Sequence, residues 1–130
     1  MKITFEGKKK VVADYKGYHI VTDQPVQVGG EGSAPAPFDL FVASLGTCAG
    51  FYVRSFCDQR SIPTYGIRLE LETITDKETH LVSTIDIKIY LPAGFPEKYK
   101  DAVVNAANLC TVKRHLHKPP TMLVSATIES

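Results

Sequence analysis

Apolar and polar residues follow two different periods along this chain, and together these periods predict a mixture of strands and helices. Near the N-terminus, short segments rich in β-branched and aromatic residues predict three strands. These strands are Ile3 to Phe5, Lys10 to Tyr15 and Tyr18 to Thr22. The next segment, from Asp23 to Pro37, is rich in glycine and proline and has no apolar period, so it is predicted to be a loop. Loops of about fifteen residues are uncommon in compact domains and are often functional.

The longest apolar stretch begins at Pro37 and predicts a central helix. Pro37 suits the first helical position, and Asp39 brings a negative charge to the positive end of the helix dipole. Apolar residues then cover every side of the helix over its first turns, as in helices that are buried. The helix turns polar from Arg54 onward, and Pro63 ends it. Gly46 and Gly50 lie among other small residues, which allows another backbone to approach closely. We therefore expect a homodimer in which two central helices pack together.

The second half of the chain alternates strands with helices. Residues Ile67 to Thr75 and Leu81 to Leu91 show period-two alternation and are separated by a short polar turn, which predicts a hairpin with one solvated face. The elements predicted after it are helices at Glu97 to Leu109 and Thr111 to His117 and a final strand at Met122 to Ile128. The predicted fold class is α+β, with a single domain over residues 1–130.

Charge and composition narrow the function. The 15 basic and 14 acidic residues nearly cancel, and no concentrated basic face indicates binding to nucleic acid. The N-terminus lacks the apolar core of a signal peptide, and no uninterrupted apolar run reaches the roughly 18 residues expected of a membrane span. Three cysteines, an odd number, are typical of a reducing compartment. We therefore expect a cytoplasmic protein that binds neither membrane nor nucleic acid.

The cysteines carry the candidate chemistry. Cys48 lies in the central helix and Cys110 at the predicted start of a later helix, where unsatisfied N–H groups would favour a thiolate on Cys110. The basic residues of that later helix would add positive charge if they faced the sulfur. Cys57 is nine residues after Cys48 on one helix, so the two point to roughly opposite sides and cannot pair. We interpret Cys57 as a packing residue, and for Cys48 and Cys110 both inert packing and redox chemistry remain open.

The central helix also resembles a known family. The segment from Pro37 to Cys48, PFDLFVASLGTC, is similar to the start of the central helix in the OsmC/Ohr family, where a Pro-Glu-x-Leu-x-x-Ala run leads into a cysteine. Cys110 matches the second cysteine of that family, and the order of predicted elements is similar over essentially the whole chain. The resemblance implies an OsmC-like fold, in which antiparallel sheets wrap long central helices in an intertwined homodimer with its active sites at the subunit interface.

The resemblance further implies an organic hydroperoxide reductase that acts in oxidative stress defence. Cys48 would attack the peroxide bond, Cys110 would resolve the sulfenic acid to a disulfide, and a thiol or lipoyl reductant would restore both thiols. No cofactor and no metal are implied. Apolar side chains around Cys48 would suit an alkyl or lipid peroxide better than hydrogen peroxide. The residues expected there are Phe41, Leu45, Phe51 and Tyr52.

The chain departs from the family at the residues that activate the thiol. The peroxidases of the family use an arginine from the N-terminal strands, oriented by the glutamate that follows the helix-starting proline. Here that position is Phe38, Asp39 is displaced by one place, and no arginine precedes Arg54. The basic residues that could substitute are Lys10, Lys16 and His19. The chain is therefore expected to belong to a divergent branch.

Two other functions fit the same residues. One is a binding module on the same scaffold, which would hold a small apolar molecule without turnover. The other is a hydrolase with Cys48 as nucleophile, for which His19 is the plausible base.

A metal site and a dinucleotide site are not expected. The Cys-x4-His-x-His spacing of Cys110, His115 and His117 fits no zinc pattern, and helical residues two apart do not share a face. The glycines between Gly29 and Gly32 lack the spacing of a dinucleotide-binding loop, so a lid or a dimer-spanning loop is the simpler interpretation.

Overall fold

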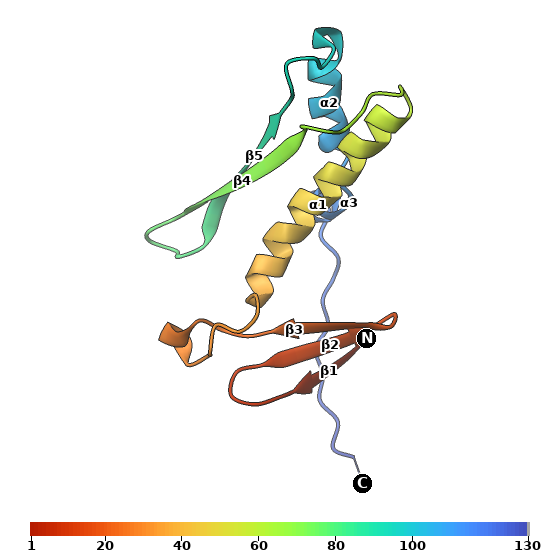
Figure 1. The fold of residues 1–130 in the computed structure, drawn as a ribbon. Helices are drawn as coiled ribbons and strands as arrows, with labels where there is room; N and C mark the ends of the chain where they lie inside the picture. Colours follow the sequence, from red (N-terminus) through yellow and green to blue (C-terminus); the bar gives the residue numbers. More distant parts are fainter. Residues whose placement is uncertain (130) are drawn as a thin grey trace. The chain divides into compact units, whose positions relative to one another are not determined.

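The structure is a computed structural model that describes residues 1–129 (Figure 1). Over these residues the chain forms five strands and three α-helices, with two short 3-10 turns. The chain divides into two compact units, Met1–Ser44 and the part from Leu45 onward, and the central helix α1 contributes to both. The mixture of antiparallel sheets and a long helix agrees with the predicted α+β class.

The N-terminal unit contains a three-stranded antiparallel sheet in the order β1-β2-β3. Its strands are β1 (Lys2–Phe5), β2 (Val11–Tyr15) and β3 (Tyr18–Thr22). Lys16 and Gly17 both have positive φ, 52° and 80°, so they form the tight turn that suits the right-handed twist of a hairpin. Val12, in the middle strand, is completely buried. All three strands were predicted, to within a residue at each end.

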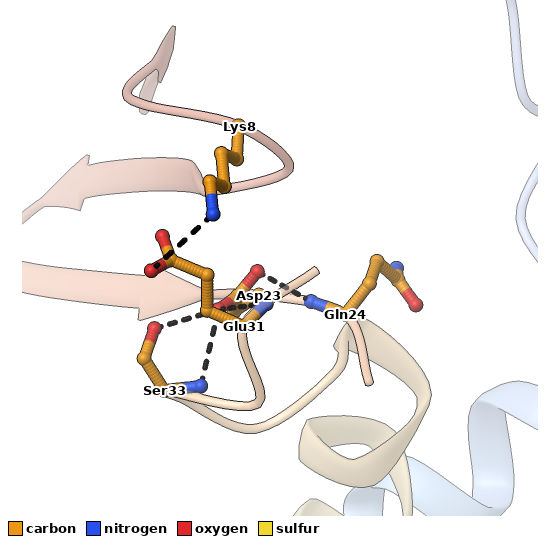
Figure 2. Close-up of polar contacts among 5 residues, drawn as sticks. All are labelled: Lys8, Asp23, Gln24, Glu31 and Ser33. Carbon is orange, nitrogen blue, oxygen red and sulfur yellow. Dashed lines mark hydrogen bonds and ion pairs between the residues drawn. The ribbon is translucent and has the colours of Figure 1, made fainter. Parts of the chain in front are cut away.

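Asp23 organises the loop that follows this sheet (Figure 2). Its carboxylate is buried and accepts hydrogen bonds from the Ser33 hydroxyl at 2.6 Å and from the backbone N–H groups of Gln24, Glu31 and Ser33. The Ser33 hydroxyl, followed by these N–H groups, holds the pKa of Asp23 far below its ordinary value. Lys8 Nζ lies 3.8 Å from the Glu31 carboxylate and joins the loop to the β1–β2 turn. The loop, which includes the 3-10 turn η1 (Val26–Val28), is therefore internally bonded along much of its length.

Helix α1 (Pro37–Asp58) begins at the predicted proline and ends before Pro63. The Asp39 carboxylate accepts the backbone N–H of Ala36 and so satisfies a donor at the start of the helix. One face is buried in the chain, at Leu45, Ala49, Val53, Phe56 and Cys57. The expected burial on all sides is not found within this chain, since Phe51 on another face is 62% exposed. The helix is long and apolar enough to cross a membrane by length and composition alone, a criterion that core helices of soluble proteins also meet.

The second unit packs a hairpin and two further helices against α1. Strands β4 (Arg68–Thr75) and β5 (Val82–Tyr90) pair antiparallel, as predicted, with Leu71 opposite Ile87. The 3-10 turn η2 (Glu97–Tyr99) leads into α2 (Lys100–Ala107), and α3 (Thr111–His117) follows with its predicted bounds. The buried core joins α1 to α2 through Val53, Phe56, Cys57, Val103 and Ala106.

Gly46 explains part of the small-residue pattern on α1. A Cβ atom at Gly46 would lie only 2.9 Å from Leu71 Cδ1, so the absent side chain makes room for a residue of β4. At Gly50, no atom of the described chain lies within 4 Å of such a Cβ, apart from its neighbours and its own helix. One of the two glycines is therefore used by the hairpin of the same chain, and the other is open.

The predicted final strand, Met122 to Ile128, is wrong for this chain. The described residues after α3 form no helix or strand, and the apolar side chains of this segment are almost fully exposed. Their exposed fractions are 85% for Met122, 90% for Leu123, 99% for Val124 and 98% for Ile128. A strand has no hydrogen bonds of its own and requires a neighbour, whereas an alternating sequence only supplies side chains that suit one.

Candidate functional site

The fold brings Cys48 and Cys110 together, although they lie far apart in the sequence. Cys48 is half-buried on α1, and Cys110 is buried at the N-cap of α3. The two thiols are hydrogen-bonded to each other, and both are free in this structure. The fold therefore brings the two selected thiols close enough for each to shift the pKa of the other, and a two-cysteine reaction requires such proximity.

Packing of α2 and α3 fixes the position of Cys110. Val103 and Ala106 anchor α2 in the core, and the chain turns immediately after this helix. The Cys110 sulfur then accepts the backbone N–H of Lys113 at 3.4 Å and lies 4.0 Å from the Leu45 carbonyl of α1. The side chain that caps α3 is thus the same one that meets Cys48.

Hydrogen bonds favour the thiolate of Cys48. Burial alone would raise the pKa of Cys48, but four donors outweigh it and leave this pKa below its ordinary value. The donors are the N–H of Val112, the Cys110 thiol, and the N–H and hydroxyl of Thr111. The first residues of α3 therefore direct their donors at a cysteine on another helix.

Cys110 has the opposite character. Burial raises the pKa of the Cys110 thiol, and the adjacent Cys48 sulfur raises it further, against a smaller lowering by the N–H of Lys113. The prediction that a helix start would favour a thiolate on Cys110 is therefore wrong, because desolvation outweighs the hydrogen bonds at that sulfur. The flanking cations do not change this, since Lys113 Nζ binds Asn108 Oδ1 at 2.6 Å and His115 bonds the Thr111 carbonyl.

Tyr52 and Thr111 complete the polar surroundings of Cys48, and sequence reasoning missed this role for both. The Tyr52 hydroxyl lies 2.9 Å from the Thr111 hydroxyl, and hydrogen bonding by Thr111 contributes to the lowered pKa of Cys48. Tyr52 follows Cys48 by four residues on α1, so the two share a helix face. That spacing was visible in the sequence, but the arrival of Thr111 between them depends on tertiary packing.

An apolar cavity of about 300 Å³ borders the Cys110 side of the pair. It lies between α1, β5 and the α2–α3 segment. It is lined by Leu45, Ala49, Ile85, Ile87, Ile89, Val104, Ala107, Asn108, Cys110, Lys113 and Leu116. Leu45 is the only one of the four side chains expected around Cys48 that lines it. The cavity is therefore bordered by Cys110, whereas Cys48 is not among its lining residues.

The remaining candidates have other surroundings. Cys57 is completely buried in the core, and burial raises the pKa of its thiol, in agreement with a packing role. The ring of His19 lies 2.6 Å from Asp14 and 3.8 Å from Glu6 in the N-terminal unit, and the hydrogen bond to Asp14 raises the pKa of His19. Within residues 1–129, no group of three His, Cys, Asp or Glu side chains is placed to hold a metal ion.

Residues 30–125 match the sequence profile of the OsmC-like protein family. The chain belongs to this family. The structure is similar to that of an osmotic stress induced and detoxification response protein from Psychrobacter arcticus, with a TM-score of 0.76 and 26% identity, covering 87% of this chain and 84% of that one. An organic hydroperoxide resistance protein, OsmC, from Legionella pneumophila is 18% identical over 87% of this chain and 90% of its own, with a TM-score of 0.47. No curated protein sequence matches significantly.

Family membership confirms the resemblance that the central helix suggested. The α+β fold of this OsmC-like protein, with its long central helix and antiparallel sheets, matches the Psychrobacter arcticus structure over most of both chains. The match to the family profile spans residues 30–125, so it includes both Cys48 and Cys110.

Proposed function

We propose that this OsmC-like protein reduces organic hydroperoxides, with Cys48 as the attacking thiol and Cys110 as the resolving thiol. The observation that carries this proposal is the proximity of two thiols of unequal acidity. Cys48 has a lowered pKa and is partly accessible, whereas Cys110 has a raised pKa and is buried. The thiolate is the nucleophilic form of cysteine, so Cys48 is the better attacking group.

The reaction would proceed in two steps. In the first, the Cys48 thiolate attacks the terminal peroxide oxygen, the O–O bond breaks, and the alkoxide takes up a proton and leaves as an alcohol. Cys48 is thereby oxidised to a sulfenic acid. In the second, the Cys110 sulfur attacks the Cys48 sulfur, forms a disulfide, and releases the sulfenic oxygen as water. Two thiol groups of an external reductant, a small dithiol or a lipoyl group, then restore both cysteines.

The cavity supports an organic substrate. Most of its lining residues are aliphatic, and Cys110, whose thiol lies near the Cys48 thiol, is one of them. An alkyl group of moderate size would lose water-exposed apolar surface there, which favours an alkyl hydroperoxide over hydrogen peroxide. The detoxification response named for the Psychrobacter arcticus protein accords with such an activity.

We also propose that the protein works as a homodimer. Phe51 on α1 is 62% exposed in the single chain. The large apolar side chains of the segment after Pro120 are almost fully exposed. Gly50 is open on the same helix. Burial of such surfaces by a second copy would supply the partner that the single chain lacks.

Peroxide consumption by the reduced protein tests the proposal. We expect a loss of cumene hydroperoxide that depends on added dithiol and rises with pH through the pKa of Cys48, with a midpoint below that of an ordinary thiol. Trypsin separates the three cysteines into residues 17–54, 55–60 and 101–113, so a disulfide that joins the first and third peptides identifies the pair. Cys48→Ser should abolish consumption, whereas the matched control Cys57→Ser should retain it. Unchanged consumption by Cys48→Ser would exclude the mechanism.

A binding module is the second candidate, and the cavity favours it, because an apolar cavity can hold a ligand without any thiol chemistry. Mass spectrometry of the intact native protein would reveal a retained apolar molecule. Such a ligand, found together with no peroxide consumption, would favour binding over turnover.

A further inference from the structure

The cavity beside Cys110 has an apolar lining with one polar side. Eight of its eleven lining residues are aliphatic, and the other three are Asn108, Cys110 and Lys113, which hydrogen bonds join to one another. Its volume of about 300 Å³ is at the lower end for ligand pockets. Since liquid water occupies about 30 Å³ per molecule, this volume suits a ligand of about ten non-hydrogen atoms. The cavity therefore fits a small molecule with an aliphatic body and one polar end.

Lys113 is the one charged residue in this lining, within the part of the chain that the structure describes. Strand β5 also carries charges, but Asp86 and Lys88 alternate with the isoleucines that line the cavity. Successive side chains of a strand point to opposite faces, so both charges lie on the other face of the hairpin, where Lys88 pairs with Glu72. Among the residues that line the cavity, Lys113 therefore sets the electrostatic character.

The ammonium group of Lys113 is held in place but is not neutralised. Lys113 is half-buried, and its Nζ donates to Asn108 Oδ1 at 2.6 Å. None of the ion pairs within residues 1–129 includes Lys113. A lysine can only donate, so the amide oxygen of Asn108 faces it and the amide NH₂ group remains a donor. An ammonium group and an amide NH₂ group, both from residues that line an apolar cavity, are suitable partners for a carboxylate.

We propose that this cavity binds a small apolar carboxylate, whose alkyl chain lies against the isoleucines of β5 and whose carboxylate pairs with Lys113 and Asn108. The alkyl chain loses water-exposed apolar surface in the cavity. The carboxylate gains a charge-assisted hydrogen bond in partly buried surroundings, where the attraction is stronger than in water. An alcohol lacks this charge, and Lys113 repels an alkylammonium ion. The inference rests on the proposed function for the use of the cavity, and deepens it by adding an anionic end to the apolar ligands proposed there.

Calorimetric titration of the reduced protein with unreactive ligands tests this inference. Octanoate is of the size that the cavity accommodates, and 1-octanol and octylammonium carry the same alkyl chain with a neutral and a positive end. We expect octanoate to bind about ten-fold more tightly than 1-octanol, and octylammonium to bind most weakly. Hexanoate, which is shorter by two methylene groups, should bind about ten-fold more weakly than octanoate, because it buries less apolar surface.

Asn108→Asp tests the role of the charge with almost no change in volume. The introduced carboxylate would neutralise Lys113 and repel the ligand, so the affinity for octanoate should fall about ten-fold, whereas the affinity for 1-octanol should stay the same. Asn105→Asp is the matched control, because Asn105 is exposed on α2 and does not line the cavity. This control should retain octanoate binding. Lys113→Met keeps an unbranched side chain without the charge and should lower the octanoate affinity to that of 1-octanol.

Three results would overturn the inference. The first is equal affinity of the wild-type protein for octanoate and 1-octanol, and the second is an equal loss of octanoate binding in Asn108→Asp and Asn105→Asp. The third is an absence of binding by every ligand, which would show that another surface, such as that of a second copy, fills the cavity. Octanoate has no peroxide bond and its titration needs no turnover, so the inference can fail while peroxide consumption through Cys48 persists, and the reverse.

Discussion

At the scale of single residues, the site depends on unequal environments for two identical side chains. The N–H groups and hydroxyl at the start of α3 serve Cys48, while burial dominates at Cys110. The sequence allowed both cysteines to be selected, because each occupies a recognisable position on its helix. It did not allow their acidities to be ranked, since the donors to Cys48 come from residues more than sixty positions away.

Cys110→Ser separates the two roles. We expect this variant to consume about one equivalent of peroxide per chain and then to stop, because no second thiol is present to resolve the sulfenic acid on Cys48. Dimedone, which reacts with sulfenic acids, should add to the peptide 17–54 in this variant and much less in the wild-type protein. Sustained dithiol-dependent turnover by Cys110→Ser at the wild-type rate would remove Cys110 from the mechanism.

Asp23 should make the N-terminal unit sensitive to acid. Hydrogen bonds lower the pKa of Asp23 in the folded state, so its stabilisation is present above the unfolded pKa of about 3.9 and is lost as the pH falls towards the folded pKa. Asp23→Asn leaves at least one of the donors from Gln24, Glu31 or Ser33 without its acceptor, because an amide offers a single acceptor oxygen. We therefore expect Asn to lower the urea midpoint at pH 7, and the difference from wild type to shrink below about pH 4.

A control at Asp76 makes this measurement specific. Asp76 also accepts two backbone N–H groups and has a lowered pKa, but it lies in the exposed β4–β5 turn. Asp76→Asn should therefore change the midpoint less than Asp23→Asn does. Equal effects of the two substitutions, or a pH-independent effect of Asp23→Asn, would contradict the account of the loop.

At the scale of elements, local patterns were sufficient wherever an element carries its own hydrogen bonds or a neighbour close in sequence. The central helix, the β4–β5 hairpin and α3 were predicted with nearly their observed bounds, because a helix bonds internally and a hairpin bonds across one turn. The strand predicted after Pro120 failed for the complementary reason. Its alternating sequence suits a sheet, but within residues 1–129 nothing pairs with it.

The glycines of α1 provide a matched test of helix packing. Gly50→Ala should raise the free energy of unfolding by about 1 kcal/mol, because alanine favours a helix and no side chain of the described chain obstructs it. Gly46→Ala should gain less, because its Cβ would press on Leu71 Cδ1 at 2.9 Å. Urea unfolding of both variants measures the difference. A loss of stability in Gly50→Ala would show that a backbone from another copy approaches this position.

At the scale of the whole molecule, the exposed apolar residues are the strongest reason to expect a second copy. The segment after Pro120 exposes Leu123 and Val124 almost completely, and solvent exposure of such side chains in a row is unfavourable. Light scattering during size exclusion should therefore give twice the mass of the chain at micromolar concentration.

Charge substitutions locate the interface. Leu123→Asp should weaken the dimer about ten-fold or more, since burial of a leucine side chain contributes roughly 1.5–3 kcal/mol and every 1.4 kcal/mol is a factor of ten in affinity. Ser125→Asp carries the same charge from a position that is already polar in the same segment, so it should leave the dimer largely intact. If the protein is a monomer throughout, or if both substitutions act equally, the segment after α3 is not the contact. A different partner would then have to cover the alternating apolar side chains of this segment, because their exposure to water is unfavourable.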